Sequence, residues 1–469
     1  MRFITLSILL ILALGCDFGD TNIDVSRPAE VTSDLLLPIT LTQAAYTQSG
    51  VPARMSGVFM QYLTGFDAKL VAYQDYTFDR STFDNLWQTG IYAGVLKDAE
   101  VLIEQARREG ENHYQAIGHV IQAMWFAETA SMFGDIPYSE ALRGPEILQP
   151  AYDTQMAVYA GVQMQLDTAI QLLNEPVRGL TPGADDLIFG GDASAWTETA
   201  YALKARYLMH TAAVEPENFQ KVLDILQNDA FQSADREPGF AFGISQTSNN
   251  PYAKFGSERP NTMIVEDPTD TDPIAKFATR LLERDDPRFS RYTTLDANAN
   301  YYLFFDPSNL DLRWSKDNSV IPYISHSELK FMEAEAQFQL GDNSAATATL
   351  KEALRASMEL NNVELTTEVE AWIEDRIGSD TDLLEIIEEA YFAYYGVAPL
   401  QTWTNYKRTG FPLLPLNPDA NLTNSPSGRI PVRFFYPSVE ISRNNANVSA
   451  AIERQGGDLL DVRTAAFGG

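Results

Sequence analysis

Residues 336–354 read Ala336-Gln-Phe-Gln-Leu-Gly341-Asp342-Asn-Ser-Ala-Ala346-Thr-Ala-Thr-Leu350-Lys-Glu-Ala353-Leu354, with a Gly-Asp turn near the middle. Small alanines stand on both sides of the turn, where two helices would cross closely. Glycine after a run of helical spacing marks a helix end, and aspartate marks the start of the next helix. The segment therefore predicts a helix–turn–helix unit whose two helices pack against each other.

Helical spacing of apolar residues recurs along much of the chain after about Asn85. The expected helices cover about 95–109, 114–133, 159–173 and 194–213, and two more helix pairs are expected between about 326 and 396. The unit at 336–354 resembles the tetratricopeptide helix pair, which stacks into arrays. We therefore expect an all-α fold of tetratricopeptide-like helix pairs, with residues 34–469 forming a single domain.

Three long stretches between the helical blocks lack regular spacing. They cover 232–273, 292–322 and 397–447, and they are rich in proline, asparagine, acidic or aromatic residues. Long irregular loops in a compact protein more often carry function than not. Ligand contacts are therefore expected in such loops.

The N-terminus has the plan of a bacterial export signal. Arg2 supplies one positive charge, an apolar run follows to Leu14, and Gly15 precedes Cys16, the only cysteine of the chain. Leu12-Ala13-Leu14-Gly15-Cys16 resembles a lipobox, in which the cysteine is acylated. We expect a signal peptide at 1–15, a lipid on Cys16 that holds the protein to the membrane, and a tether at 16–33. The alternative is an ordinary secretory signal with an incidental cysteine.

Charge and composition exclude some classes of partner. The chain of 469 residues carries a formal net charge of −30, so a partner rich in phosphate, such as a nucleic acid, is not expected. The sequence holds 25 phenylalanines, 21 tyrosines and 6 tryptophans. These flat side chains serve a core, and they also serve surfaces that bind sugars or peptides.

No catalytic or metal-binding constellation stands out. The four histidines, His113, His119, His210 and His326, form no His-x-x-x-His pair, and the sequence has no Gly-x-Ser-x-Gly elbow or phosphate loop. The acidic run 266–272 lacks the spacing of a calcium loop. We expect no catalytic residues, no cofactor and no metal, and we interpret the acidic run as a solvated loop.

Seven motifs together resemble the SusD/RagB family of nutrient-binding outer-membrane lipoproteins. They are Met132-Phe-Gly-Asp-Ile-Pro-Tyr-Ser-Glu-Ala141, Tyr152-Asp-Thr-Gln155, Trp196 with Ala202-Leu-Lys-Ala-Arg206, Asp286-Pro-Arg288, Glu333-Ala-Glu-Ala336, Tyr406-Lys-Arg-Thr-Gly-Phe-Pro412 and Arg433-Phe-Phe-Tyr-Pro437. The resemblance implies tetratricopeptide-like helix pairs plus a less regular ligand-binding part. It also implies a lipid-anchored protein of the outer membrane that faces the cell exterior. Such a protein captures oligosaccharide or peptide and delivers it to a SusC-like TonB-dependent transporter.

Two aromatic-rich loops fit a sugar-binding platform, which needs flat apolar faces and a polar rim. One holds Phe66, Tyr73, Tyr76, Phe78 and Arg80, and the other holds Tyr301, Tyr302 and Trp314. The predicted ligand-binding residues are Tyr73, Tyr76, Arg80, Tyr302 and Trp314, each of which also fits a place in the core. Two alternatives to a binding lipoprotein stay open: an extracytoplasmic glycan-degrading enzyme, and a helical-repeat lipoprotein that binds only other proteins.

Overall fold

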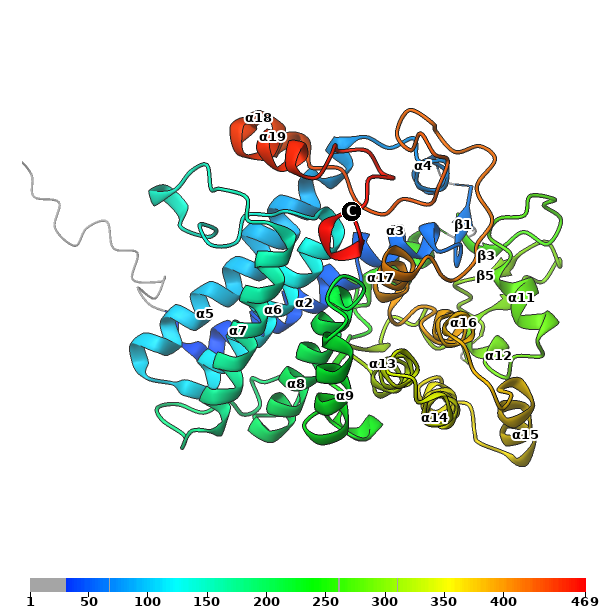
Figure 1. Ribbon diagram of the computed structural model, residues 1–469, viewed down its shortest axis with the longest axis horizontal. Helices are drawn as coiled ribbons and strands as arrows, with labels where there is room; N and C mark the ends of the chain where they lie inside the picture. The colour runs from blue at the N-terminus through cyan, green and yellow to red at the C-terminus, as the bar shows by residue number, and fades with distance from the viewer. Residues whose placement is uncertain (1–30, 67, 260–261, 310) are drawn as a thin grey trace, which may run out of the picture.

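Figure 1 shows the computed structural model, which describes residues 31–66, 68–259, 262–309 and 311–469. The described chain is mostly helical, which confirms the predicted fold class. Its α-helices are α2 (Ser33–Gln48), α3 (Val51–Phe59), α4 (Ala68–Gln74), α5 (Leu96–Glu109), α6 (Asn112–Phe133), α7 (Gln155–Asn174), α8 (Ala193–Thr211), α9 (Asn218–Asn228), α10 (Pro251–Glu258), α11 (Phe277–Glu283), α12 (Phe289–Tyr292), α13 (His326–Gln339), α14 (Asn343–Leu360), α15 (Thr367–Arg376), α16 (Leu383–Ala393), α17 (Pro399–Thr409), α18 (Ser438–Arg443) and α19 (Asn445–Arg454).

The helices pack in chain order, as an array of helix pairs does. α5 packs on α6, α6 on α7, α7 on α8 and α8 on α9; α9 then packs on α13, which pairs with α14. In Figure 1 the long helices α5, α6 and α7 lie side by side at one end of the molecule, and α13 to α15 lie toward the other. The predicted tetratricopeptide-like pairing of helices is therefore confirmed.

The turn at Gly341 and Asp342 has the predicted geometry. Gly341 takes a φ of 88°, a left-handed conformation that favours glycine and that lets the chain leave α13. The Asp342 carboxylate then accepts a hydrogen bond from the Ala345 amide at 3.0 Å, which caps the start of α14. A local signal of two residues thus sets one helix end and the next helix start.

Six short strands complete the part of the fold that the structure describes. They are β1 (Thr64–Gly65), β2 (Gly239–Ala241), β3 (Met263–Glu266), β4 (Thr294–Leu295), β5 (Tyr302–Leu303) and β6 (Val320–Pro322). One antiparallel sheet has the order β1-β3-β5-β4, and β2 pairs with β6. Because β3 lies between β1 and β5, the first sheet brings the loop after residue 65 next to the loop before residue 302.

The prediction that helices begin only after about Asn85 is wrong, because α2, α3 and α4 precede that position. In α2, Leu35 and Ile39 are exposed while Leu37 and Leu41 are buried. Apolar residues on both faces hide the helical period on which the prediction depends. The stretch 397–447 also contains α17, which starts at Pro399 and ends before Gly410 at a φ of 80°.

The predicted signal peptide, Cys16 and all but the end of the tether lie outside the described residues. Within the described ranges, no helix is long and apolar enough to cross a membrane.

Candidate functional site

Trp314, one of the predicted stacking residues, is part of the core. Only 1% of its surface is exposed, and its indole Nε1 donates a hydrogen bond to Asn361 Oδ1 at 2.8 Å. Gly396, at a φ of 72°, lies against the ring so closely that an added Cβ would come within 2.6 Å of it. Trp314 therefore fixes a loop to the helices and presents no ring face to a ligand in this structure.

Tyr73 and Tyr76 are also buried, with 1% and 3% of their surfaces exposed. The Tyr76 ring meets Phe59 edge to face at a centroid distance of 6.0 Å, and Tyr73 meets Phe78 in the same way at 6.0 Å. Burial raises the pKa of the Tyr76 hydroxyl. Their rings stabilise the core, so the prediction of exposed stacking faces at Tyr73, Tyr76 and Trp314 is not supported.

Arg80 is half-exposed but engaged with the protein. Its guanidinium forms an ion pair with Asp458 and lies over the Phe435 ring, with Cζ 5.3 Å from the ring centroid. Asp458 also pairs with the buried Arg433 at 3.1 Å. In this structure Arg80 holds the C-terminal segment through these contacts. Only the exposed part of its side chain is available to a ligand.

An exposed aromatic surface forms where the two predicted loops meet. Phe66 is 56% exposed and meets Tyr301 edge to face, with ring centroids 5.2 Å apart. Tyr302 follows on β5, half-buried, and its ring packs on Phe289 at 5.9 Å. We call Phe66, Tyr301 and Tyr302 the aromatic surface. The structure thus brings together the two loops that the sequence singled out, but through other residues than Tyr76 and Trp314.

Hydrogen bonds of the main chain fix the backbone at both residues of this pair. The Phe66 amide donates to Thr262 O at 3.1 Å, which continues the pairing of β1 with β3. Asp296 Oδ1 accepts from the Tyr301 amide at 2.8 Å, and hydrogen bonds from the Tyr301 and Asn300 amides hold the pKa of Asp296 below its usual range. A preformed surface loses less conformational entropy on binding than a mobile one.

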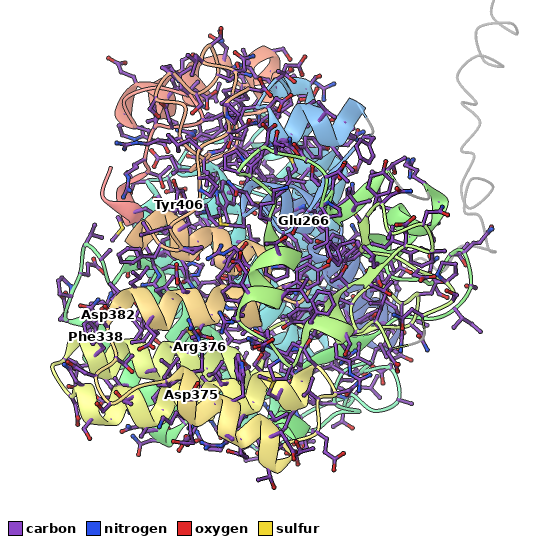
Figure 2. All side chains as sticks on the ribbon, turned by 90° about the vertical axis from the view of Figure 1, so that its right-hand side faces the viewer. Glu266, Phe338, Asp375, Arg376, Asp382 and Tyr406 are labelled. Carbon is purple, nitrogen blue, oxygen red and sulfur yellow. The ribbon has the colours of Figure 1, made fainter. Side chains whose placement is uncertain are left out.

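Charged residues lie on or near the segments that pair with the aromatic surface. Arg54 and Arg259 lie on the Phe255 ring, with Cζ 4.4 and 4.7 Å from its centroid. Arg259 shares a turn with Thr262, whose hydroxyl donates to Arg259 O at 2.7 Å. Glu266 on β3, which is labelled in Figure 2, is buried and lies opposite Tyr302 in the sheet. Its carboxylate accepts a hydrogen bond from the Thr279 amide at 2.7 Å. Of these charged groups, the Arg259 side chain is the most exposed, at 44%.

Aspartate carboxylates of the acidic run 266–272 accept hydrogen bonds from backbone amides of the same run. Asp267 Oδ1 accepts from the Thr269 amide at 2.8 Å, and Asp270 Oδ1 accepts from the Asp272 amide at 2.9 Å. Among the described residues, no group of three or more His, Cys, Asp or Glu side chains has a geometry that could hold a metal ion.

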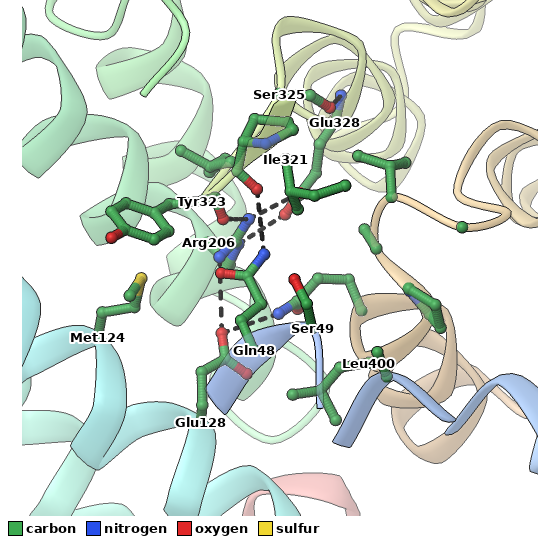
Figure 3. Close-up of a pocket in the computed structure, with 18 of the residues that line it drawn as sticks. Gln48, Ser49, Met124, Glu128, Arg206, Ile321, Tyr323, Ser325, Glu328 and Leu400 are labelled. Atoms are coloured by element: carbon green, nitrogen blue, oxygen red, sulfur yellow. Dashed lines mark hydrogen bonds and ion pairs between the residues drawn. The ribbon is translucent and has the colours of Figure 1, made fainter. Parts of the chain in front are cut away.

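A small internal cavity lies around Arg206 (Figure 3). The Arg206 guanidinium donates to Glu328 Oε1 and Oε2 at 2.6 and 2.7 Å, and it lies 3.5 Å from Glu128 Oε1. Burial raises the pKa of Glu128 in spite of this neighbouring cation. The cavity has a volume of about 40 Å³, far below the roughly 300–1,000 Å³ of small-molecule sites. It has no room for an oligosaccharide.

The four arginines of the sequence motifs form ion pairs within the scaffold. Arg206 pairs with Glu328, Arg288 with Asp286 at 2.7 Å, Arg408 with Glu335, and Arg433 with Asp458. All four arginines are buried. The pairs of Arg206 with Glu328 and of Arg408 with Glu335 join segments that are far apart in the chain, whereas Asp286 lies only two residues from Arg288.

Known proteins share this fold. The family model described as "starch-binding associating with outer membrane", a SusD-like model, matches residues 25–437. A SusD/RagB family protein from Bacteroides thetaiotaomicron has a similar structure, with 25% identity and a TM-score of 0.75, over 94% of this chain and 100% of that one. A search of curated proteins finds no match to this chain.

Two further solved structures share the fold. A chitin-binding protein has 19% identity and a TM-score of 0.76, over 93% of this chain and 100% of that one. A chitin-binding SusD homologue from Flavobacterium johnsoniae has 15% identity and a TM-score of 0.73, over 92% and 98%. The match of the family model over nearly the whole chain, together with these structures, shows that the chain belongs to the SusD-like family.

Proposed function

We propose that this protein is a lipid-anchored glycan-binding protein of the outer membrane that captures an oligosaccharide on the aromatic surface and delivers it to a SusC-like TonB-dependent transporter. In this proposal residues 1–15 are the signal peptide, residues 16–33 are the tether, and residues 34–469 form one binding domain that faces the cell exterior. The observation that carries the proposal is the pair of Phe66, which is more than half exposed, and Tyr301, which is half-buried, both held by hydrogen bonds of the main chain.

The chemistry of a pyranose fits this surface. Its C–H faces stack on flat apolar rings, while its hydroxyls take hydrogen bonds from groups at the rim. Phe66 offers a ring that is 56% exposed, and Tyr301 and Tyr302 add hydroxyl groups beside their rings. The part-exposed cation Arg259 provides donors at the border. Arg80 and Tyr302 keep their predicted ligand roles within this proposal, Tyr302 at the surface and Arg80 through its exposed side.

The proposal excludes cleavage of the ligand, in line with a family of binding proteins. A peptide ligand stays compatible with the same rings, because aromatic faces also anchor apolar side chains. The discriminating observation is the fate of the bound molecule. A glycan-degrading enzyme would shorten an oligosaccharide during incubation, whereas a binding protein returns it unchanged. A protein that binds only other proteins would show no affinity for either ligand.

Removing one ring of the aromatic surface is expected to weaken glycan binding strongly. Phe66→Ala and Tyr301→Ala should each cost about 1–3 kcal/mol, or roughly 5- to 150-fold in affinity, as aromatic anchors do elsewhere. Calorimetry with chito-oligosaccharides, malto-oligosaccharides and short peptides on the mature protein measures this. Phe338→Ala is the matched control, because Figure 2 places Phe338 well away from Glu266, a residue of β3. Equal affinity of all variants for a confirmed ligand would place the binding site elsewhere.

Loss of the single thiol is expected to release the protein from the membrane. Cys16→Ala should move it from the membrane fraction to the soluble fraction, because the two or three acyl chains of a bacterial lipoprotein hold stably where one chain holds marginally. Fractionation measures the shift, and mass spectrometry of the mature N-terminus checks the modification. An unmodified Cys16 in the mature protein, or a mature chain without Cys16, contradicts this prediction.

A further inference from the structure

A second, polar cleft lies at the end of the molecule opposite the aromatic surface. It opens between α5, α6, α7 and the loop that follows α6, and its volume is about 410 Å³. This volume falls within the range of about 300–1,000 Å³ that is typical of small-molecule sites. Figure 1 shows α5 to α7 at one end of the molecule and β1, β3 and β5 at the other. The cleft is therefore separate from the surface proposed above.

A chain of hydrogen-bonded side chains forms the floor of the cleft. Gln122 Nε2 donates to Glu100 Oε2 at 2.8 Å, and Gln165 Nε2 donates to Gln122 Oε1 at 2.5 Å. The same Gln165 amide lies 3.4 Å from His119 Nδ1. With both of these contacts made through Nε2, the Gln165 carbonyl Oε1 has no hydrogen-bond partner within the described part of the chain. The chain of bonds fixes the orientation of these planar groups and leaves an acceptor for a ligand.

One wall of the cleft is aromatic and rigid. The Tyr138 ring meets Phe126 edge to face, with centroids 4.8 Å apart. It lies directly on the backbone of Gly161 in α7, where an added Cβ would come within 2.4 Å of the ring. Only glycine allows this close approach, so Gly161 is the residue of α7 that makes room for the Tyr138 ring. Met164, which is 66% exposed, extends the apolar side of the cleft.

The charges of the cleft favour an uncharged ligand. Burial lowers the pKa of His119 to about 4, so its imidazole is neutral at neutral pH. Glu100 is the one carboxylate of the lining and Arg143 the one cation. Glu100 Oε2 already accepts a hydrogen bond from the Gln122 amide. The carboxylate therefore has less hydrogen-bonding capacity left for an ammonium group. Planar amides, a neutral imidazole and an aromatic wall suit hydroxyl groups and the C–H faces of a sugar ring.

We propose that this cleft is a second ligand site, which binds a short, uncharged saccharide of one or two rings between Tyr138 and the amides of Gln122 and Gln165. The site goes beyond the function proposed above and does not depend on it, because no residue of the aromatic surface lines the cleft.

The test uses saturation-transfer NMR with two probes, N,N′-diacetylchitobiose and maltose, on the mature protein. The starting protein carries Phe66→Ala and Tyr301→Ala, so that the aromatic surface contributes little. Gln165→Leu removes the amide at nearly constant size, and Met164→Trp adds bulk at an exposed position that does not affect the core. Gln171→Leu is the matched control, because Gln171 lies on the same helix and contacts Glu175 instead of the cleft.

Saturation transfer to at least one probe is expected in the starting protein. It should fall by at least about fivefold in Gln165→Leu, as expected for the loss of hydrogen bonds worth about 1 kcal/mol. It should fall by a similar factor in Met164→Trp and stay unchanged in Gln171→Leu. The proposal is overturned if neither probe shows transfer in the folded starting protein, or if transfer is insensitive to both cleft variants. Stronger competition by free glycine than by either sugar would assign the cleft to an amino acid. If this proposal fails, the affinity losses expected for Phe66→Ala and Tyr301→Ala in otherwise wild-type protein are not affected. The two proposals can therefore be overturned independently of each other.

Discussion

Arg206→Met is expected to lower the free energy of unfolding by about 3–5 kcal/mol, the usual cost of removing one partner from a buried ion pair. Arg206 is 3% exposed, and its guanidinium makes two hydrogen bonds to Glu328 and one to Tyr323 O at 2.8 Å. Without it, Glu328 and Glu128 are two buried carboxylates with no neighbouring cation in the cavity. Guanidinium titration followed by circular dichroism measures the change.

Two further variants separate the charge effect from lost packing. Arg206→Met with Glu328→Leu should be more stable than Arg206→Met alone, because the uncompensated carboxylate of Glu328 is gone. Arg178→Met is the surface control. Arg178 pairs with Glu175 at 2.7 Å, but its side chain is 59% exposed, so the loss should stay below about 1 kcal/mol. A loss of less than about 1 kcal/mol for Arg206→Met would show that the buried pair contributes little to stability.

Helix pairs could be predicted from the sequence because their signals are local. The period of α5 and the Gly341-Asp342 turn lie within one or two helical turns of the residues that they arrange. That a buried arginine pairs with a carboxylate could be predicted as a rule, since buried charges need partners. The identity of a partner such as Glu328, 122 residues from Arg206, could not. Local pattern determines the elements, whereas tertiary packing determines which partners meet.

The exposure of an aromatic ring depends on residues that are distant in the sequence. Phe66 is exposed because β1 pairs with β3, about 200 residues away, and holds the backbone beside Thr262. Tyr76, ten residues later and just after α4, is buried against Phe59. Nothing in the local sequence distinguishes these two rings. The second cleft was missed for the same reason, because its polar groups come from three helices and a loop.

Trp314→Ala is expected to cost about 3–5 kcal/mol of unfolding free energy, the usual cost of removing a large buried side chain, and to leave the affinity for a glycan unchanged. The sequence predicted a stacking role for this residue, so the outcome separates the two interpretations. Trp314 is enclosed by Gly396 and Asn361, and truncation would leave a cavity and an unpaired Asn361 Oδ1. The free energy of unfolding and the calorimetric affinity are measured on the same preparation.

Trp314→Phe keeps an aromatic ring in the core and removes only the donor to Asn361, so it should cost less than Trp314→Ala, about 1–3 kcal/mol for an unsatisfied buried acceptor.

Phe66→Ala should show the opposite pattern to Trp314→Ala, with a large loss of affinity and little loss of stability, because the Phe66 ring is more than half exposed. Loss of affinity alone in Phe66→Ala, and loss of stability alone in Trp314→Ala, would distinguish a ligand-binding ring from a core ring. If Trp314→Ala folds with unchanged stability and loses affinity, the ring reaches the ligand and the loop that holds it must open to bind. If both variants lose affinity in proportion to stability, binding reports only on folding, and the aromatic surface has no ligand role.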